Sequence, residues 1–311
     1  MKKSYRKLLM AAGAVLATFA LGACGAADDA QADLSQAAQT AAEATTEADA
    51  SAAAGESTAV ENRLEAIKES GKLTMATSPD FAPFEFEDIS GSEKVYAGSD
   101  IELGKFLAEK LGVELVIEPM DFSACQAAVS SGAVDISISA YSPTPERAEN
   151  MGLSDPYFVG GDKDRFQGVL VKKDRAEELS THDSFAGKKI AAQNGALQQT
   201  LVTEQLPDSE METVTNVNDA IMMLQTGKVD GIAIAVKVGE QYMANYPDLV
   251  LSDYYFDIED QGNVVLVQKG QDELLAAINE AMKEANDQEL PQKWYADALE
   301  QAKALGFDVS E

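Results

Sequence analysis

Arg147 is the side chain of this sequence best suited to binding a charged ligand. Thr144 is of a type favoured at a helix N-cap, and Pro145 suits the first helical position, so the sequence predicts that a helix begins here. Arg147 then lies in the first turn, where the helix dipole disfavours a cation, and a local rule broken in this way often marks a functional site. With neighbouring backbone N–H groups it would form a bidentate anion site; the alternative is a surface arginine paired with Glu146 or Glu149.

Residues able to perform nucleophilic or acid–base chemistry are few. The single histidine, His182, lies in a polar stretch and is expected in a solvated loop. Cys125 lies in an Ala-rich helical stretch without an obvious histidine partner, so we expect a small buried apolar filler. The sequence contains neither zinc-ligand spacing nor a glycine-rich phosphate loop. We therefore expect no catalytic residue, no metal and no cofactor.

The charge of the chain is strongly negative. Its 311 residues include 24 Lys and Arg against 53 Asp and Glu, a net charge of −29. Such a chain should avoid nucleic acid and anionic lipid headgroups, and the charge mainly favours solubility.

The N-terminus has the pattern of an export signal. A basic start is followed by an apolar run over residues 8–21 that is short for a transmembrane helix. The run ends in Leu-Gly-Ala-Cys24, which resembles a bacterial lipobox; this resemblance implies cleavage after residue 23 and lipidation of Cys24. The alternatives are an ordinary signal peptide with a chance cysteine, or an uncleaved anchor. Residues 24–60 are rich in Ala and acidic residues and poor in large apolar ones, so we expect a disordered tether.

From residue 61 onward, short apolar strands alternate with amphipathic helices. This order predicts an α/β fold with a largely parallel sheet. The pattern begins again on a second sheet, and two extended crossings flank that middle block. We expect the first lobe over residues 61–158, the second lobe over 159–261, and a return to the first lobe over 262–311. Ser99 and Glu102 are expected to form a capping box. The strands are predicted over 72–77, 113–117, 133–140, 166–172, 188–192, 211–214, 229–235 and 263–268. The helices are predicted over 99–111, 122–131, 197–205, 218–226, 273–285 and 294–305.

Several segments of this body follow one another in a characteristic order. They are Ser78-Pro79-Asp80-Phe81-Ala82-Pro83-Phe84-Glu85-Phe86, Gly98-Ser99-Asp100-Ile101-Glu102-Leu103, Met120-Asp121-Phe122, Ser131-Gly132-Ala133-Val134-Asp135, Ser142-Pro143-Thr144-Pro145-Glu146-Arg147, Ser154-Asp155-Pro156-Tyr157-Phe158, Gly187-Lys188-Lys189 and Gly227-Lys228-Val229-Asp230. In this order they resemble segments of bacterial extracellular solute-binding protein family 3, the substrate-binding lipoproteins of polar amino-acid ABC transporters. The resemblance covers roughly residues 70–300. It implies a periplasmic-binding-protein-like type II fold, with two α/β lobes joined by two hinge strands and a ligand in the cleft between them.

The resemblance also assigns roles to residues. Arg147 would bind the ligand's α-carboxylate, and Phe81 would be an aromatic wall against the ligand, whereas Phe84 and Phe86 are expected in the core. Tyr141 is a further candidate wall. The strand-end residues that would meet the carboxylate and amino group are Ser139, Ala140 and Ser142, of which Ala140 offers only its backbone. The second-lobe loop would contribute Gln193, Ala196, Leu197 and Gln198.

Three departures from the family pattern affect the ligand site, and two of them concern the ligand's amino group. Ser78 and Ala235 stand where many members place the aspartates that hold an ammonium group, and Ser99 stands where a second aromatic wall usually falls. A buried cation without an acidic partner is costly. We therefore expect either that another acid serves, with Glu85, Glu87 and Asp162 as candidates, or that the ligand lacks a standard free α-amino group.

The sequence thus predicts a monomeric, extracytoplasmic, lipid-anchored substrate-binding component of an ABC importer, which binds an amino acid or an amino-acid-like carboxylate and docks on the permease. Two other functions on the same fold stay open. One is an enzyme resembling cyclohexadienyl dehydratase, and the other is a sensor subunit that presents its ligand to a receptor.

Overall fold

The computed structural model describes residues 62–158, 166–258 and 262–307. The predicted signal peptide, Cys24, the tether and Asp162 lie outside the described residues. Within the described ranges, no helix is both long and apolar enough to cross a membrane.

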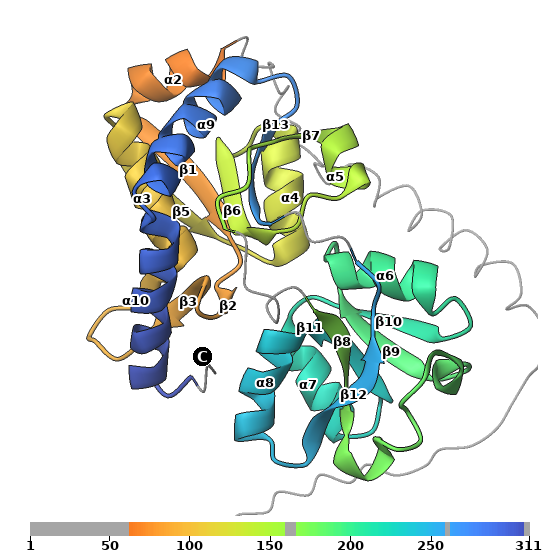
Figure 1. Cartoon of the computed structure of the whole chain (residues 1–311). Coiled ribbons are helices and arrows are strands. Elements are labelled where there is room, and N and C mark those ends of the chain that lie inside the picture. The colour runs from red at the N-terminus through yellow and green to blue at the C-terminus, as the bar shows by residue number, and fades with distance from the viewer. Residues whose placement is uncertain (1–61, 159–165, 259–261, 308–311) are drawn as a thin grey trace, which may run out of the picture. The chain divides into compact units, whose positions relative to one another are not determined.

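A first mixed sheet has the strand order β5-β1-β6-β13-β7 (Figure 1). Strand β1 pairs in parallel with β5 and β6, whereas β13 is antiparallel to β6 and β7. The strands are β1 (Lys72–Thr77), β5 (Glu114–Pro119), β6 (Ile136–Tyr141), β7 (Met151–Leu153) and β13 (Val264–Gln268). The accompanying helices are α2 (Arg63–Ser70), α3 (Ser99–Leu111), α4 (Phe122–Ser131), α5 (Pro145–Asn150), α9 (Asp272–Asp287) and α10 (Leu290–Ala304). A small separate sheet consists of β2 (Asp80–Phe81), β3 (Glu85–Asp88) and β4 (Val95–Ala97).

A second mixed sheet repeats this design with the order β10-β9-β11-β8-β12. Strand β9 is parallel to β10 and β11, and β8 is antiparallel to β11 and β12. The strands are β8 (Gln167–Lys172), β9 (Lys189–Gln193), β10 (Glu210–Val214), β11 (Gly231–Ala235) and β12 (Leu249–Tyr255). The helices are α6 (Leu197–Gln205), α7 (Val217–Gln225) and α8 (Val236–Asn245), with 3₁₀ turns η1 (Lys173–Arg175) and η2 (His182–Phe185).

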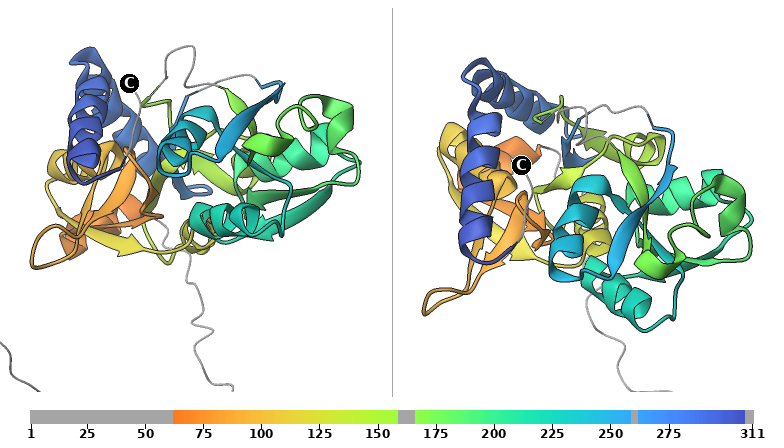
Figure 2. Two further views of the ribbon diagram at one scale, coloured as in Figure 1. Left: turned by 90° about the horizontal axis from the view of Figure 1, so that it is seen from below. Right: turned by 60° about the horizontal axis from the view of Figure 1, so that its bottom comes forward.

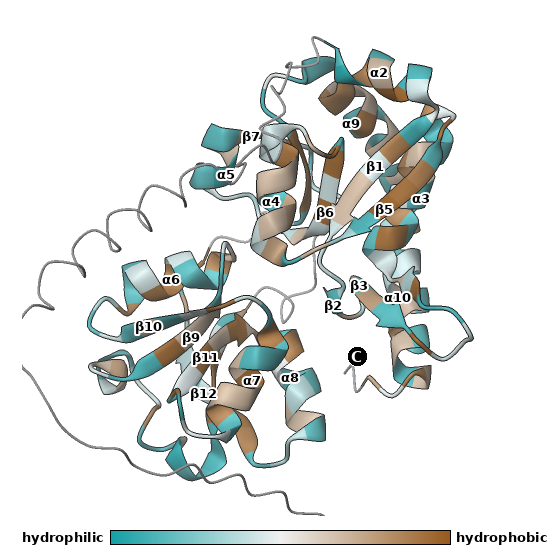
Figure 3. Ribbon diagram, turned by 180° about the vertical axis from the view of Figure 1, so that it is seen from behind, coloured by the Kyte–Doolittle hydropathy of each residue, from teal (hydrophilic) through white to brown (hydrophobic). Residues whose placement is uncertain are grey.

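Each sheet is apolar on both faces because alternate side chains of its strands pack against helices on opposite sides. In β13, Val265 and Val267 pack with α2, α3 and α9, while Val264 and Leu266 pack with α4. In β8, Leu170 packs with α7 and α8, while Val169 and Val171 pack with α6. Figure 3 shows hydrophobic segments within strands of both sheets and alternating hydrophobic and polar segments along the helices.

The prediction of a largely parallel sheet was wrong. Half of the neighbouring strand pairs within each of the two sheets are antiparallel. The reason lies in the two crossings, since the chain leaves the first sheet after β7 and returns to it in β13. Strands that enter a sheet by such a crossing need no helical βαβ connection and can therefore run against their neighbours.

The two crossing segments meet where they leave the first sheet. Phe158 and Asn263 form an antiparallel bridge, in which the Asn263 N–H donates to the Phe158 carbonyl at 2.8 Å. The Tyr157 N–H donates in turn to the Asn263 carbonyl at 2.9 Å. This pairing agrees with the strand topology, and we retain as a proposal the division into lobes at residues 61–158, 159–261 and 262–311.

Helix α3 begins differently from the prediction. Gly98, not Ser99, is its N-cap, and no side chain caps it, so the predicted Ser99–Glu102 capping box is absent. The N–H groups of Ser99 and Asp100 donate instead to the carbonyls of Pro83 and Phe84. Gly98 allows this close approach because it has a φ of 127° and because a Cβ there would lie 2.0 Å from the Phe84 oxygen. Glu102 pairs with Lys105.

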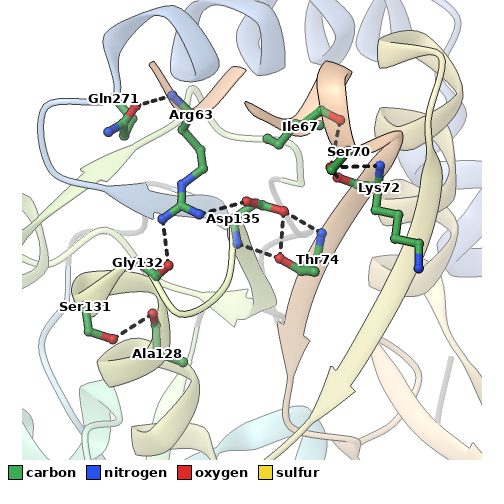
Figure 4. A network of polar contacts seen from close by, with 10 residues as sticks. All are labelled: Arg63, Ile67, Ser70, Lys72, Thr74, Ala128, Ser131, Gly132, Asp135 and Gln271. Carbon is green, nitrogen blue, oxygen red and sulfur yellow. Dashed lines mark hydrogen bonds and ion pairs between the residues drawn. The ribbon is translucent and has the colours of Figure 1, made fainter. Parts of the chain in front are cut away.

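A polar network fixes helix α2 to the first sheet (Figure 4). The Arg63 guanidinium donates to Asp135 at 3.2 Å and to the Gly132 carbonyl at 2.6 Å. The other Asp135 oxygen accepts from the backbone N–H and hydroxyl of Thr74, at 2.7 and 2.6 Å. Asp135 therefore has a structural role in joining β1, α2 and the turn before β6.

The C-terminal helices return to the beginning of the described chain. Figure 2 shows the blue helices α9 and α10 beside the orange and yellow segments that contain α2 and α3. Trp294 of α10 packs on Phe106 of α3, with ring centroids 5.5 Å apart. Ala298 and Ala302 pack with Phe86 and Ala97 of the small sheet. The C-terminal helices thus cover the hairpin that carries Asp80 and Phe81.

Candidate functional site

The sequence correctly predicted the local structure that positions Arg147. Thr144 is the N-cap of α5, its hydroxyl accepts the Arg147 N–H at 3.2 Å, and Pro145 occupies the first turn. Arg147 is only 4% exposed, and no side chain among the described residues forms an ion pair with it. The alternative of a surface arginine paired with Glu146 or Glu149 was therefore wrong.

The guanidinium of Arg147 meets neutral acceptors. Its Nε donates to Gln126 Oε1 at 3.1 Å, its Nη1 to the Ser142 carbonyl at 2.5 Å, and its Nη2 to the Gly195 carbonyl at 2.7 Å. The group also lies over the ring of Tyr141, 5.2 Å from its centroid. Burial lowers the pKa of Arg147 to about 10. A desolvated cation held only by neutral groups is well placed to accept an anion.

The end of strand β6 lies directly beside this arginine. Ala140 has a φ of 46°, uncommon for a residue with a Cβ, and its N–H donates to Asp100 at 2.7 Å. Ser139 is buried, accepts the Ser78 N–H at 3.2 Å and donates to Glu85 at 2.7 Å. These contacts engage the Ser139 hydroxyl and the Ala140 N–H within the protein.

Two other predicted residues of this strand end differ in exposure. Tyr141 is fully buried, and its hydroxyl lies 2.9 Å from the Ser137 hydroxyl. The Tyr141 ring therefore packs against the Arg147 guanidinium and is not an exposed aromatic surface for a ligand. Ser142 is half-buried and contacts Arg147 through its carbonyl.

The loop before α6 brings the second sheet to Arg147. Gly195 has a φ of 73°, and its carbonyl accepts from both Arg147 and Gln126. A Cβ at Gly195 would lie 2.9 Å from the Gln126 amide nitrogen, so the close approach favours glycine. Ala196 is the N-cap of α6 without a side-chain cap, and Leu197 and Gln198 form its first turn. Arg147, Gly195, Ala196 and Leu197 line one common pocket.

Phe81 projects from the small hairpin onto the second sheet. It packs against the apolar cluster of α7 and β11 and stacks on Phe84, with ring centroids 5.6 Å apart. Phe86 is buried as predicted, whereas Phe84 is half-buried in an aromatic group with Phe158 and Tyr295. Phe81 also lines a pocket at the second sheet. The pocket's other lining residues are Gln193, Gln198, Val214, Val217, Ala220, Ile232, Ala233, Ile234 and Ala235.

The remaining predicted residues, Ser78 and Ser99, are both buried. The Ser78 hydroxyl donates to Asp80 Oδ1 at 3.0 Å. The Ser99 hydroxyl, at the first residue of α3, has no hydrogen-bond partner among the described residues. Ala235, at the end of β11, is the uncapped N-cap of α8. Ser78 thus forms a hydrogen bond with the neighbouring Asp80, and Ala235 contributes only a small apolar surface.

A buried carboxyl pair lies behind this site. Glu85 and Asp100 each have one oxygen without a hydrogen-bond donor among the described residues, while Tyr157 donates to the other Asp100 oxygen at 2.8 Å. Burial and the neighbouring Asp100 charge raise the pKa of Glu85 well above its usual range, and burial raises the pKa of Asp100 to about 6. The two raised pKa values favour a proton shared between Glu85 and Asp100.

The sequence analysis missed two residues of the site. Gln126 holds both the guanidinium of Arg147 and the carbonyl of Gly195. Asp80 accepts the hydroxyl of Ser78 and approaches Gln193 Nε2 at 3.4 Å. The position of Asp80 directly before Phe81 was an available signal in the sequence. Nothing in the sequence around Gln126 sets it apart from other helix glutamines.

The residues considered for catalysis lie elsewhere. His182 is exposed in η2 and pairs with Asp183 at 2.8 Å, and Cys125 lies on α4 with its side chain buried in the core. Burial raises the pKa of the Cys125 thiol to about 12, which keeps it in the unreactive thiol form. Among the described residues, no cluster of three or more His, Cys, Asp or Glu side chains is placed to hold a metal ion.

Comparisons with known proteins agree with this arrangement. Residues 73–297 match the family model of bacterial extracellular solute-binding proteins, family 3. The arginine-binding extracellular protein ArtP of Bacillus subtilis is 31% identical over 238 residues, which are 73% of this chain and 88% of ArtP. A crystal structure of the amino acid ABC transporter substrate-binding protein AbpA from Streptococcus pneumoniae, bound to L-arginine, is 32% identical. It superposes with a TM-score of 0.70 over 79% of this chain and 100% of that one, which confirms the predicted type II fold.

One relative that is named as an enzyme is similar to this chain over a shorter stretch. Cyclohexadienyl dehydratase of Pseudomonas aeruginosa is 36% identical over 103 residues, which are 33% of this chain and 37% of that enzyme.

Proposed function

This chain belongs to the bacterial extracellular solute-binding proteins of family 3, and on that premise we propose that it captures an L-amino acid, with L-arginine as the first candidate, for an ABC importer. The observation that carries the proposal is Arg147, a buried cation held by neutral acceptors, which faces a loop of the second sheet. ArtP and AbpA, which are similar over nearly their whole lengths, carry names that refer to amino-acid binding, and the AbpA structure contains L-arginine.

The ligand's carboxylate would take the place of the neutral acceptors around Arg147. Ser142 and Gly195 now present carbonyl oxygens to Nη1 and Nη2. A carboxylate there would form charge-assisted hydrogen bonds, which are stronger than those to a neutral carbonyl. Backbone N–H groups at the uncapped start of α6, at Leu197 and Gln198, would add donors from the second sheet.

The ligand's side chain would lie against Phe81. This ring is half-buried beside Gln193, Gln198 and Ala235 in a largely apolar pocket. An aromatic face suits the methylene groups of a long side chain and attracts a guanidinium. Because Arg147 belongs to one sheet and the loop at Gly195 to the other, one ligand would contact both. Ligand contacts to both lobes favour the closed state, which we propose is recognised by the permease.

The protein acts outside the cytoplasm as a solute-binding protein and not as an enzyme, since its matches over most of their length are to binding proteins. Attachment to the membrane through lipid on Cys24, with residues 24–60 as a tether and residues 1–23 removed, is a further part of the proposal. It rests on the lipobox-like sequence alone.

A titration of the purified protein with the twenty common L-amino acids tests the proposal. We expect L-arginine to bind with a Kd in the micromolar range or tighter. It should also raise Tm, because a ligand present at 100 times its Kd stabilises the folded protein by about 2.7 kcal/mol. If no L-amino acid shifts Tm or gives a binding isotherm, the proposed function is wrong. Turnover of a cyclohexadienyl acid by the protein would favour the dehydratase instead.

A further inference from the structure

Asp80 is a partly desolvated carboxylate next to the proposed ligand pocket. Its Oδ1 accepts the hydroxyl of Ser78 at 3.0 Å, and its Oδ2 lies 3.4 Å from Gln193 Nε2. Burial raises the pKa of Asp80, and hydrogen bonds from Ser78 and from the backbone N–H of Val217 oppose that rise. None of the ion pairs among the described residues includes Asp80, so its negative charge meets only neutral donors.

Asp80 and Arg147 contact the two ends of one short loop. Gln193 reaches Asp80, and Gly195, two residues further along, accepts from Arg147. Two residue steps span at most about 7 Å of backbone. A carboxylate without a cation and a guanidinium without an anion therefore contact the same short loop. An α-amino acid carries the two complementary charges.

The other acids near the site are less able to hold a cation. Glu85 is 1% exposed, accepts from Ser139 and lies beside the charge of Asp100, so burial closes it off from an incoming cation. Glu87 lies at the surface and pairs with Lys94 at 2.7 Å. Ala235, at the end of β11, has no charge to contribute. Of these residues, only Asp80 combines a partly buried carboxylate with a position beside Phe81 and Gln193.

We propose that Asp80, oriented by Ser78 and Gln193, binds the α-ammonium group of the ligand in place of the acids absent at positions 78 and 235. Ser78 then has a defined use, because its hydroxyl holds Oδ1 of the carboxylate, whereas Oδ2 is approached by the Gln193 amide. The amide of Gln193 is a weak donor to Asp80 at 3.4 Å and can give way to a cation. The inference rests on the proposed amino-acid function and assigns its ammonium site.

A ligand-and-variant cycle tests this assignment. L-Arginine and its analogue without the α-amino group, 5-guanidinopentanoic acid, are titrated against the wild-type protein and Asp80→Asn. Asparagine keeps an oxygen that can accept from Ser78 but removes the charge. We expect removal of the α-amino group to weaken binding to the wild type by about 10- to 100-fold. Asp80→Asn should weaken L-arginine binding by a similar factor and make the protein nearly indifferent to the α-amino group.

Asp121→Asn is the matched control. Asp121 is an exposed acid whose charge acts on Asp80, so this variant removes the same formal charge without touching the proposed contact. It should bind L-arginine within about 2- to 3-fold of the wild type. The assignment is overturned if Asp80→Asn binds L-arginine with the wild-type Kd. It is also overturned if removal of the ligand's α-amino group raises Kd by the same factor in both proteins. If the wild type binds no amino acid, the proposed function itself fails, which is a distinguishable result.

Discussion

The buried pair of Glu85 and Asp100 determines the local backbone at the candidate site. Asp100 accepts the N–H of Ala140, whose positive φ is unfavourable for alanine, and Glu85 accepts the hydroxyl of Ser139. Two carboxyl oxygens that face each other without another donor are satisfied when one of them is protonated. One proton between the two acids thus helps to hold the strand end that contacts Arg147.

This pair should make folding stability depend on pH. An unfolded aspartate releases its proton near pH 4, whereas burial raises the pKa of Asp100 to about 6 and that of Glu85 well above its usual range. The folded state therefore binds more protons between these values, so the pair's contribution is full below about pH 4 and is lost as pH rises through about 6. For Asp100 the shift corresponds to something on the order of 3 kcal/mol.

Asp100→Asn checks this dependence. Its amide oxygen can still accept from Ala140 and Tyr157, and its NH₂ group can donate to Glu85. In thermal melts between pH 4.5 and 8, we expect the variant's Tm to rise relative to the wild type by several degrees as pH increases. The exposed Asp253→Asn should follow the wild-type curve. Parallel curves for all three proteins would show that the pair does not hold a shared proton.

At the scale of elements, the loop between β9 and α6 is the contact from the second sheet to Arg147. It needs glycine at residue 195, for both the left-handed backbone and the approach to Gln126. The Gly195 carbonyl accepts from Arg147, and the Gly195 N–H donates to the side-chain oxygen of Gln199 at 2.8 Å. The geometry of this loop, more than its side chains, therefore controls what can bind at Arg147.

Two glycine-to-alanine substitutions distinguish an effect on folding stability from an effect on ligand binding at this loop. Gly195→Ala places alanine at a φ of 73° against Gln126, whereas Gly227→Ala places it at 71° with no atom within 4 Å of the new Cβ. Both variants should lose about 1 kcal/mol of stability, since alanine is unfavourable in this region. Only Gly195→Ala should also bind L-arginine more weakly, by about tenfold or more. Equal affinities in the two variants would remove this loop from the site.

The elements were largely predictable, and their mutual arrangement was not. The predicted strands and helices are present in order because apolar periodicity reports burial directly. Their bounds differ by up to four residues, as in α10, predicted from residue 294 and observed from 290. Helix α8 was missed because Gly239 interrupts a weak pattern, and β2–β4 are too short to give one. The capping box failed because backbone carbonyls from a distant hairpin satisfy the start of α3.

The candidate site shows the same division. Arg147 was predictable because Thr144 and Pro145 fix its helix locally. Asp80 and Gln126 were missed because their importance comes from long-range contacts with Gln193 and Gly195. Tyr141 was predicted as a candidate wall but is buried, since nothing local tells an inward from an outward face at a strand end. Sequence patterns thus identify residues constrained by their neighbours in the chain better than those constrained across sheets.

At the scale of the whole molecule, both sheets contribute residues to the candidate site. The first contributes Arg147 and the hairpin with Phe81, and the second contributes the loop at Gly195 and the pocket at Ala235. The net charge of −29 acts at longer range and favours the approach of a cationic solute such as arginine. The central claim is that the carboxylate of an amino acid binds at Arg147.

Isothermal titration of L-arginine and L-argininamide against the wild type and Arg147→Gln tests that claim most directly. The amide keeps the ammonium and guanidinium groups but removes the carboxylate. We predict that the wild type binds the amide about 100-fold or more weakly than L-arginine, because a buried charge-assisted pair is lost. Arg147→Gln should bind both compounds weakly and with nearly equal affinity. If replacing the carboxylate by an amide raises Kd by the same factor in both proteins, Arg147 does not bind the carboxylate and the central claim is wrong.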